Sequence, residues 1–419
     1  MITRKKLNHK RILIISWEMY PIYAGGLGVL VNDLVGEMLA QGSDVTVVMP
    51  HKKTVNCISQ TVSLFQKTRK FYKLKSLVPN LKCGVDYFRS SNRNPLIVSP
   101  ELFSGGVIKT KPILYPNHTP LLTQAFAFAV QEYLTENTVF DLIIGMDWMA
   151  IATFKLLQDA KNITPFWFYV NSTEFDRTAE SKFSVTARSI MELESTYFKL
   201  AEKVVAISSL TKDILVNQYG VPESKTQVVL NHVTFSPYTN GFPELDKGKN
   251  VLFIGRLAAQ KGLSFLLDTA EKVLSFDSNA KFIIAGDGEL LGDTVTSVCE
   301  RKLENNVLFT GWVNSEQKKQ LYRSSDLFVM SSPSEPFGLT PLEAVLSGVP
   351  VISSKKCGFL DVLPSTPVFD YHDTHAFADL ILYYLQNPEI AQQLIKTQQL
   401  ELSKHSWKEQ VQSMLYEVK

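Results

Sequence analysis

Residues 332–343 read S-P-S-E-P-F-G-L-T-P-L-E and place two carboxylates around a proline and a glycine. The apolar run just before them, Asp326–Met330, predicts a buried strand. Because proline and glycine interrupt regular structure, we expect Glu335 on a loop at the carboxyl end of this strand, the edge at which open parallel sheets bind ligands. A carboxylate there could accept hydrogen bonds from hydroxyl groups, as on a sugar.

The end of the same run predicts the start of a helix. Thr340 suits the N-cap, a proline follows it, and Glu343 stands three residues after the cap. The amides of Gly338, Leu339 and Thr340 would then be free to bind a phosphate at the helix N-terminus. The residues alone leave a second interpretation open, in which Glu343 only completes a capping box and Glu335 is a solvated loop acid.

Residues 255–262 (G-R-L-A-A-Q-K-G) supply two cations near the same predicted edge. Arg256 stands where a strand should end, and Lys261 stands where the next helix should begin. Fixed cations could stabilise the negative charge that develops on a departing diphosphate. Each could also be an ordinary surface cation, since the chain holds 43 lysines and arginines.

These residues match a known family in both type and spacing. Glu335 and Glu343, eight positions apart, resemble the E-x7-E signature of retaining nucleotide-sugar glycosyltransferases of the glycogen and starch synthase type (glycosyltransferase family 4/5). Arg256 and Lys261 resemble the G-R-x4-K element of the same family. The resemblance implies that the two cations hold the donor diphosphate, with Arg256, Lys261 and Glu335 as the catalytic set. Glu335 would bind the donor sugar, and Glu343 the ribose.

Three further loops resemble binding elements of the family. They contain Gly25 and Gly26, Gly286 and Gly288, and Val313. The glycines would let backbone approach the donor, and Val313 would meet the nucleobase through its backbone, although the neighbouring Trp312 could equally be a packing residue. The first glycine pair lacks the lysine of the family's K-x-G-G-L loop, which weakens any expectation of ADP-glucose as the donor.

Two positions in the first half depart from the family. Residues 141–148 resemble D-[VI]-[IV]-H-x-H-D-W, with Met146 in place of the histidine before Asp147. Residues 171–176 resemble H-S-T-E-[FY]-D, with Asn171 in place of the histidine. We expect Asp147 and Asn171 to contact substrate, but methionine offers no hydrogen-bond donor. Loss of one well-aimed donor costs about 3 kcal/mol, or about a hundredfold in rate.

Two functions of different class therefore remain open. The first is an active retaining hexosyltransferase that moves a hexose, glucose in the first instance, from a nucleoside-diphosphate sugar to an α-glucan or another glycan. The second is a catalytically weakened relative that binds nucleotide sugar or glucan as a non-enzymatic partner. The intact motifs of the nucleotide half favour the first, and the spacing of Arg256 and Lys261 argues against a third option, sugar epimerisation.

The alternation of apolar strands and helical patterns predicts an α/β protein, with two doubly wound parallel sheets on either side of a hinge at residues 231–250. The resemblance implies the GT-B fold, two Rossmann-like domains facing across a cleft. We expect an N-terminal acceptor domain over residues 1–235, a nucleotide-sugar domain over 250–405, and a helix over 406–419 that returns to the first domain. A long helix is predicted over 179–203, and irregular strands and an extended loop over 52–115.

Composition bounds the remaining possibilities. The chain has 419 residues, 45% of them hydrophobic and 20% charged, with a net charge of +2. These values are typical of a globular protein of two domains and favour neither nucleic acid nor integral membrane as a partner. The four cysteines have no metal-ligand spacing and the N-terminus does not resemble a signal peptide, so we expect a cytoplasmic protein with reduced thiols, no metal, and no cofactor besides its donor substrate.

Overall fold

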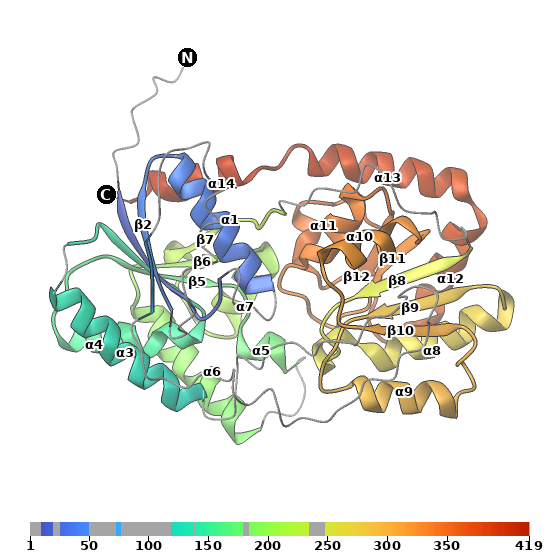
Figure 1. The fold of residues 1–419 in the computed structure, drawn as a ribbon, viewed down its shortest axis with the longest axis horizontal. Helices are drawn as coiled ribbons and strands as arrows, with labels where there is room; N and C mark the ends of the chain where they lie inside the picture. The colour runs from blue at the N-terminus through green and yellow to red at the C-terminus, as the bar shows by residue number, and fades with distance from the viewer. Residues whose placement is uncertain are drawn as a thin grey trace, which may run out of the picture.

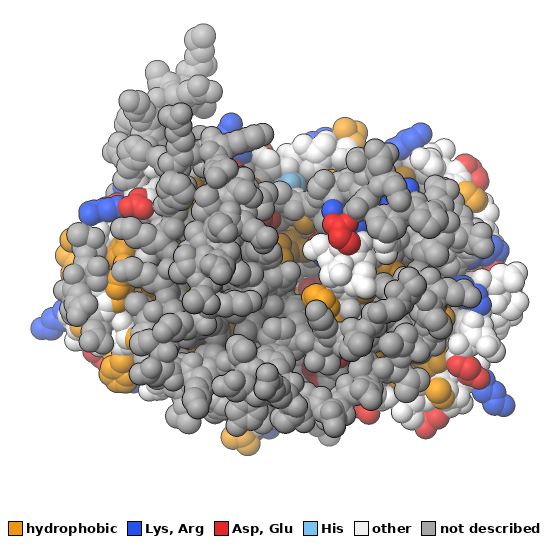
Figure 2. Space-filling model, viewed as in Figure 1, with side chains coloured by type: hydrophobic (Ala, Val, Ile, Leu, Met, Phe, Trp, Pro, Cys, Tyr) orange, Lys and Arg blue, Asp and Glu red, His pale blue; other side chains and the backbone are white. Residues whose placement is uncertain are grey.

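The computed structural model describes residues 10–19, 26–49, 73–76, 119–136, 139–178, 184–233 and 248–418. Within them the chain forms two parallel β-sheets, which lie side by side with helices packed around each (Figure 1). On the face shown in Figure 2, the acidic and basic side chains that are drawn in colour lie close to one another rather than in separate patches. The predicted α/β architecture of two doubly wound sheets is confirmed.

The first sheet has the order β3-β2-β1-β4-β5-β6-β7 in the described residues, and every pairing is parallel. Its strands are β1 (Arg11–Ile15), β2 (Asp44–Met49), β3 (Lys73–Ser76), β4 (Leu142–Met146), β5 (Phe166–Val170), β6 (Lys203–Ala206) and β7 (Thr226–Val228). Its helices are α1 (Gly26–Ala40), α3 (Thr119–Glu136), α4 (Ile151–Asp159), α5 (Glu174–Arg177), α6 (Val185–Tyr197) and α7 (Ser209–Asn217). The central strands are runs of branched and aromatic residues that the helices bury almost completely. The strand order reverses between β1 and β4, which makes their carboxyl ends a switch point.

The second sheet repeats this plan with the order β10-β9-β8-β11-β12-β13. Its strands are β8 (Asn250–Ile254), β9 (Lys281–Ala285), β10 (Val307–Gly311), β11 (Leu327–Met330), β12 (Val351–Ser354) and β13 (Val368–Phe369). Its helices are α8 (Leu263–Phe276), α9 (Leu291–Glu300), α10 (Ser315–Arg323), α11 (Leu339–Leu346), α12 (Thr374–Gln386) and α13 (Pro388–Leu402). Here the order reverses between β8 and β11, the two strands that precede the predicted cations and carboxylates.

The last helix, α14 (Trp407–Tyr416), leaves the second half and packs beside α1 on the first (Figure 1). Its apolar face is buried, with Val411 and Met414 fully inaccessible to solvent. Two hydrogen bonds fix its position: Gln41 Nε2 donates to Lys408 O at 2.9 Å, and Leu230 N donates to Gln410 Oε1 at 3.0 Å. The chain end therefore ties the two halves together.

Two local predictions were wrong, and one lies mostly outside the described residues. The helix after the E-x7-E loop begins at Leu339 and is capped by Gly338 at φ 93°, so Thr340 is not the N-cap and Glu343 completes no capping box. The helix predicted over 179–203 ends earlier than expected. The structure describes α6, then a single 3-10 turn at Phe198–Leu200, and β6 already begins at Lys203. Of residues 52–115 the structure describes only β3.

Candidate active site

Lys261 and Glu335 form an ion pair at the switch point of the second sheet. Lys261 follows β8 and Glu335 follows β11, and these two strands are neighbours. Ser332 Oγ also donates to Glu335 Oε2 at 3.1 Å, and Glu335 is only 7% exposed. The structure thus joins two of the predicted catalytic residues, which stand 74 positions apart in sequence.

A glycine turn holds Lys261 in this position. Gly262 has φ 65°, and a Cβ on it would lie 2.2 Å from Ser331 O at the end of β11. Ser331 Oγ in turn donates to Lys261 O at 2.9 Å. Because a side chain at position 262 would collide with backbone, the close approach of the two loops requires glycine.

Arg256 lies at the same edge but takes no part in the Lys261–Glu335 ion pair. Its side chain is 58% exposed, and Nη2 lies 4.0 Å from Glu289 Oε1. An exposed pair at this distance contributes little to stability, so the guanidinium is free to change partners. The structure places this predicted catalytic residue at the rim of the site, where an anion could still reach it.

Gly286 and Gly288 serve the packing of two loops against each other. A Cβ at Gly286, which has φ 141°, would lie 1.9 Å from Gly255 O. A Cβ at Gly288 would lie 2.4 Å from Leu257 O, and Leu257 N donates to Asp287 O at 3.0 Å. The contacts within the protein are enough to explain both glycines, whatever ligand approaches them.

Glu343 is held by two side chains of α10. Lys318 Nζ lies 2.7 Å from its carboxylate, and Tyr322 OH donates to Oε2 at 2.8 Å. Burial raises the pKa of the Tyr322 hydroxyl, which therefore remains a donor. Helix α10 was not predicted from the sequence, although the spacing of Asn314 and Gln317, which form the capping box at its start, is a recognisable signal.

The first turns of α1 and α11 meet where the two halves adjoin. A Cβ on Gly26, the first residue of α1, would lie 3.7 Å from Leu339 Cδ1, at the first residue of α11. The amides of Leu339 and Thr340 belong to the first turn of α11 and have no partner within their own helix. Two helix N-termini in one place create a positive potential that suits an anion. Gly25 lies outside the described residues.

The switch point of the first sheet is built around Asp147, which is buried and has φ 54°. Its Oδ1 accepts hydrogen bonds from Asn171 N at 2.6 Å and Ser172 N at 3.2 Å. Burial raises the pKa of Asp147 to about 6, although Arg177 and the two amides oppose that shift. The predicted residues Asp147 and Asn171 are therefore adjacent, but the contact that joins them is internal to the protein.

Models of two glycosyltransferase families match the two halves of the chain. Residues 11–211 match the model of the starch synthase catalytic domain, and residues 239–400 match that of glycosyl transferases group 1. The chain is a GT-B glycosyltransferase. The family resemblance found in its motifs is thereby confirmed.

Relatives of this glycosyltransferase cover nearly its whole length. It is 27% identical over 377 residues to an uncharacterised glycosyltransferase of Methanocaldococcus jannaschii, a match that covers 84% of this chain and 82% of the relative. It superposes on sucrose-phosphate synthase from Thermosynechococcus elongatus with a TM-score of 0.70 and 19% identity, over 97% of each chain. The Anabaena protein HepE in complex with UDP and glucose gives a TM-score of 0.67 and 17% identity, over 98% of this chain and 100% of its own. At these identities the two structures establish the fold.

In the first half of the glycosyltransferase, a partly buried charge cluster surrounds Arg177. Its guanidinium pairs with Glu174 at 2.8 Å and with Glu194 at 3.0 Å, and it donates to Ser172 O at 2.8 Å. Glu194 is fully buried, and burial raises its pKa to about 7. Met146 is 1% exposed and belongs to the hydrophobic core. Sequence reasoning missed this cluster because Glu194 comes from α6, which no motif connects to the loop after β5.

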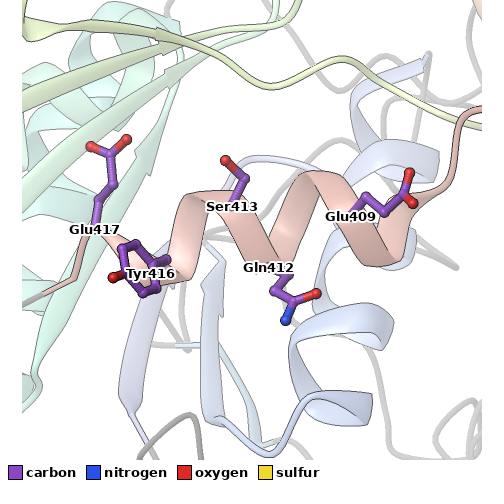
Figure 3. A pocket seen from close by; sticks show the side chains of 5 residues that line it. All are labelled: Glu409, Gln412, Ser413, Tyr416 and Glu417. Carbon is purple, nitrogen blue, oxygen red and sulfur yellow. The ribbon is translucent and has the colours of Figure 1, made fainter. Parts of the chain in front are cut away.

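Other features of the described residues lie elsewhere or provide no further site. A shallow surface pocket of about 360 Å³ is lined by α14 and the residue after it, through Glu409, Gln412, Ser413, Tyr416 and Glu417 (Figure 3). None of these residues follows a strand of either sheet. Burial raises the pKa of Cys357 to about 12, so its thiol stays protonated. In the described ranges, no group of three His, Cys, Asp or Glu side chains could hold a metal ion, and no helix is long and apolar enough to cross a membrane.

Proposed function

We propose that this glycosyltransferase is a retaining hexosyltransferase, which transfers glucose or a similar hexose from a nucleoside-diphosphate sugar to a glycan acceptor such as an α-glucan. The observation that carries the proposal is the convergence of the N-termini of α1 and α11 beside the Lys261–Glu335 pair. A diphosphate placed there would meet oriented amides and a fixed cation as its bond to the sugar breaks.

The predicted catalytic residues and Glu343 each have a role in this proposal. Lys261 and Arg256 bind the diphosphate, and the first amides of α11 support them. Glu335 lies beside Lys261, where its carboxylate would accept hydrogen bonds from the hydroxyls of the donor sugar. Glu343 would do the same for the ribose, with Lys318 and Tyr322 holding it in place.

Retention follows if the leaving diphosphate accepts the proton of the acceptor hydroxyl on the face that it leaves. The acceptor then attacks from the same side as the departing group, so the anomeric configuration is kept and no protein nucleophile is needed. The match of residues 11–211 to the starch synthase catalytic domain supports an α-glucan as acceptor.

The test is a panel of ADP-, UDP- and GDP-glucose offered with oligoglucans. UDP-glucose belongs in the panel because HepE, of the same fold, has been solved with UDP and glucose. We expect release of one nucleoside diphosphate and an α-linked product whose configuration is read by NMR. A chain that binds none of the three donors would contradict the proposal.

Binding without transfer would favour the non-catalytic partner instead. The variant Met146→His separates these outcomes, since it restores the imidazole that the family places before Asp147. Transfer that appears only in M146H would show that the natural chain binds donors but has lost the chemistry.

A further inference from the structure

The loop that carries Glu335 is held from both halves of the molecule. The Glu335 carboxylate contacts Lys261 and Ser332, which belong to the second half. The residues on either side of it contact the first half: Ser334 Oγ donates to Asp176 Oδ1 at 3.0 Å, and Pro336 O accepts from Ser208 Oγ at 2.6 Å. We call these two contacts the clasp.

Asp176, which accepts one of the two hydrogen bonds of the clasp, is itself held in a fixed position. It is fully buried, and its Oδ2 accepts from Thr173 N at 3.1 Å and from Thr173 Oγ1 at 2.7 Å, which completes the capping box of α5. The other oxygen is thereby aimed at Ser334, which is also fully buried. If the loop moved away, a buried carboxylate oxygen would lose its hydrogen bond, and that loss is costly.

Ser208 is equally constrained on the other side of the loop. It caps α7 by accepting from Thr211 N at 3.0 Å while it donates to Pro336 O. A Cβ at Gly358 would lie 2.0 Å from Pro336 O and 2.5 Å from Ser208 Oγ, so the backbone of Gly358 leaves no space beside the Ser208–Pro336 contact. Nearby, Ser209 N donates to Asp361 Oδ2 at 2.6 Å, another hydrogen bond between the halves.

We propose that the clasp makes Asp176 and Ser208 positioning residues, which set the place of Glu335 for sugar transfer only when the two halves are together. The inference rests on the proposed function, because it assigns the clasp a role in that reaction. Most of the proposed donor contacts (Arg256, Lys261, Glu343 and the first amides of α11) belong to the second half, so nucleotide binding should survive loss of the clasp. Transfer, in contrast, requires Glu335 to be aligned with an acceptor held by the first half.

The test replaces Ser334 by alanine, which removes the donor to Asp176 and leaves the capping box of α5 intact. We expect kcat to fall ten- to a hundredfold, while the Kd of UDP, ADP or GDP measured by calorimetry changes less than about twofold. Ser324→Ala is the matched control: its hydroxyl is also buried and donates to Leu321 O at 3.0 Å, but within the second half. That variant should keep kcat within about twofold of the natural chain.

A second variant guards against a simple folding defect. Asp176→Asn keeps an acceptor oxygen, and we expect its kcat to fall less than that of S334A. The loss in the double variant should be smaller than the two single losses combined, since both changes affect the Ser334–Asp176 hydrogen bond. Additive losses, or equal losses of kcat and nucleotide affinity in S334A, would overturn the proposal.

The clasp can be judged even if the proposed function fails. If the natural chain binds nucleotide but transfers no sugar, kcat cannot be measured. The same variants are then compared by their radius of gyration from X-ray scattering. S334A should then be more open than both the natural chain and S324A. An unchanged radius would refute the clasp, whereas absence of transfer in the natural chain would refute only the function.

Discussion

The carboxyl edges of the two sheets follow one plan but hold their charges differently. In the second half, Lys261 pairs with Glu335 and Lys318 pairs with Glu343, side chain to side chain. In the first half, Arg177 also pairs with two glutamates, but the predicted site residue Asp147 is satisfied by two backbone amides of the loop after β5. A side-chain pair can exchange a partner for a ligand, whereas a carboxylate bound to backbone can do so only if the loop moves.

This difference separates a chemical edge from a structural one. In the second half, substitutions at the charged residues should change donor binding and turnover with a small effect on folding. In the first half, substitution of Asp147 should change stability and its pH dependence first. The distinction between the two edges would fail if the second-half substitutions mainly changed folding, or if substitution of Asp147 left stability unchanged.

The largest effect is expected from Glu335→Gln. The amide keeps the shape of the side chain but removes the charge beside Lys261 and one strong acceptor for the sugar. Turnover should fall a hundred- to a thousandfold, which is the usual loss for one electrostatic contact of a transition state. Steady-state kinetics with the preferred donor measures it.

Glu289→Gln is the control for that change. Glu289 is 61% exposed and lies 4.0 Å from Arg256 at the rim of the same edge, so its kinetics should stay within about twofold. If E335Q kept more than a third of the natural turnover, Glu335 would be only a structural partner of Lys261.

The next effect tests the packing of the second edge rather than its charge. Gly286→Ala forces a Cβ to within 1.9 Å of Gly255 O at a positive φ, so the free energy of unfolding should fall by about 4 kcal/mol. A Cβ at Gly292, which lies in α9, would have no atom within 4 Å. Gly292→Ala should therefore raise that free energy by about 0.5 kcal/mol. Denaturant titration compares the two, and equal stabilities would show that the loop can relax away from Gly255.

The two edges also differ in how far the sequence predicts them. Local patterns identify β8, β11 and the loop between β11 and α11, because runs of apolar residues and glycine or proline breaks determine these elements. The N-cap at Thr340 was predicted wrongly, since the helix begins one residue earlier with Gly338 as its N-cap. The capping box left open for Glu343 does not form, and Lys318 and Tyr322, which come from another helix, bind Glu343. Tertiary contacts of that kind leave no local signal.

The first edge shows the same limit more strongly. The motif around Asp147 and Asn171 is visible in the sequence, but nothing local indicates that the Asp147 carboxylate binds the Asn171 amide rather than a ligand. Nor does any spacing connect Glu194 to Arg177. The substrate roles of Asp147, Asn171 and Val313 remain predictions, and so does the extent of the two domains.

The pH dependence of stability tests whether the first edge, at Asp147, is structural. Burial raises the pKa of Asp147 from 3.8 to about 6, so between these values the folded protein binds its proton more tightly than the unfolded chain. This residue therefore lowers the stability as the pH rises from 4 to 6, by up to about 1.4 kcal/mol for each pH unit, and the full cost is present above pH 6. Asp147→Asn should abolish this contribution.

Denaturant titrations between pH 4 and pH 7 measure this slope. Asp159→Asn removes an exposed carboxylate from the end of α4 in the same half and should leave the slope as it is in the natural chain. A slope unchanged in D147N would mean that Asp147 is ionised throughout this range and that its amide partners outweigh its burial.

The smallest effect comes from Lys318→Met, which tests whether a charged pair of the second edge serves a ligand. Methionine keeps the length of the side chain, and Tyr322 still holds Glu343 at 2.8 Å, so the fold should survive. Without the cation, Glu343 is less well oriented toward a ribose, and the Kd of the nucleoside diphosphate should rise about fivefold with little change in kcat. Lys319→Met is the matched control, since Lys319 pairs with the exposed Glu316 at 3.3 Å and should leave the Kd unchanged. Tighter binding in K318M would show the reverse relation, in which Lys318 competes with the ribose for Glu343 and must be displaced before the donor can bind.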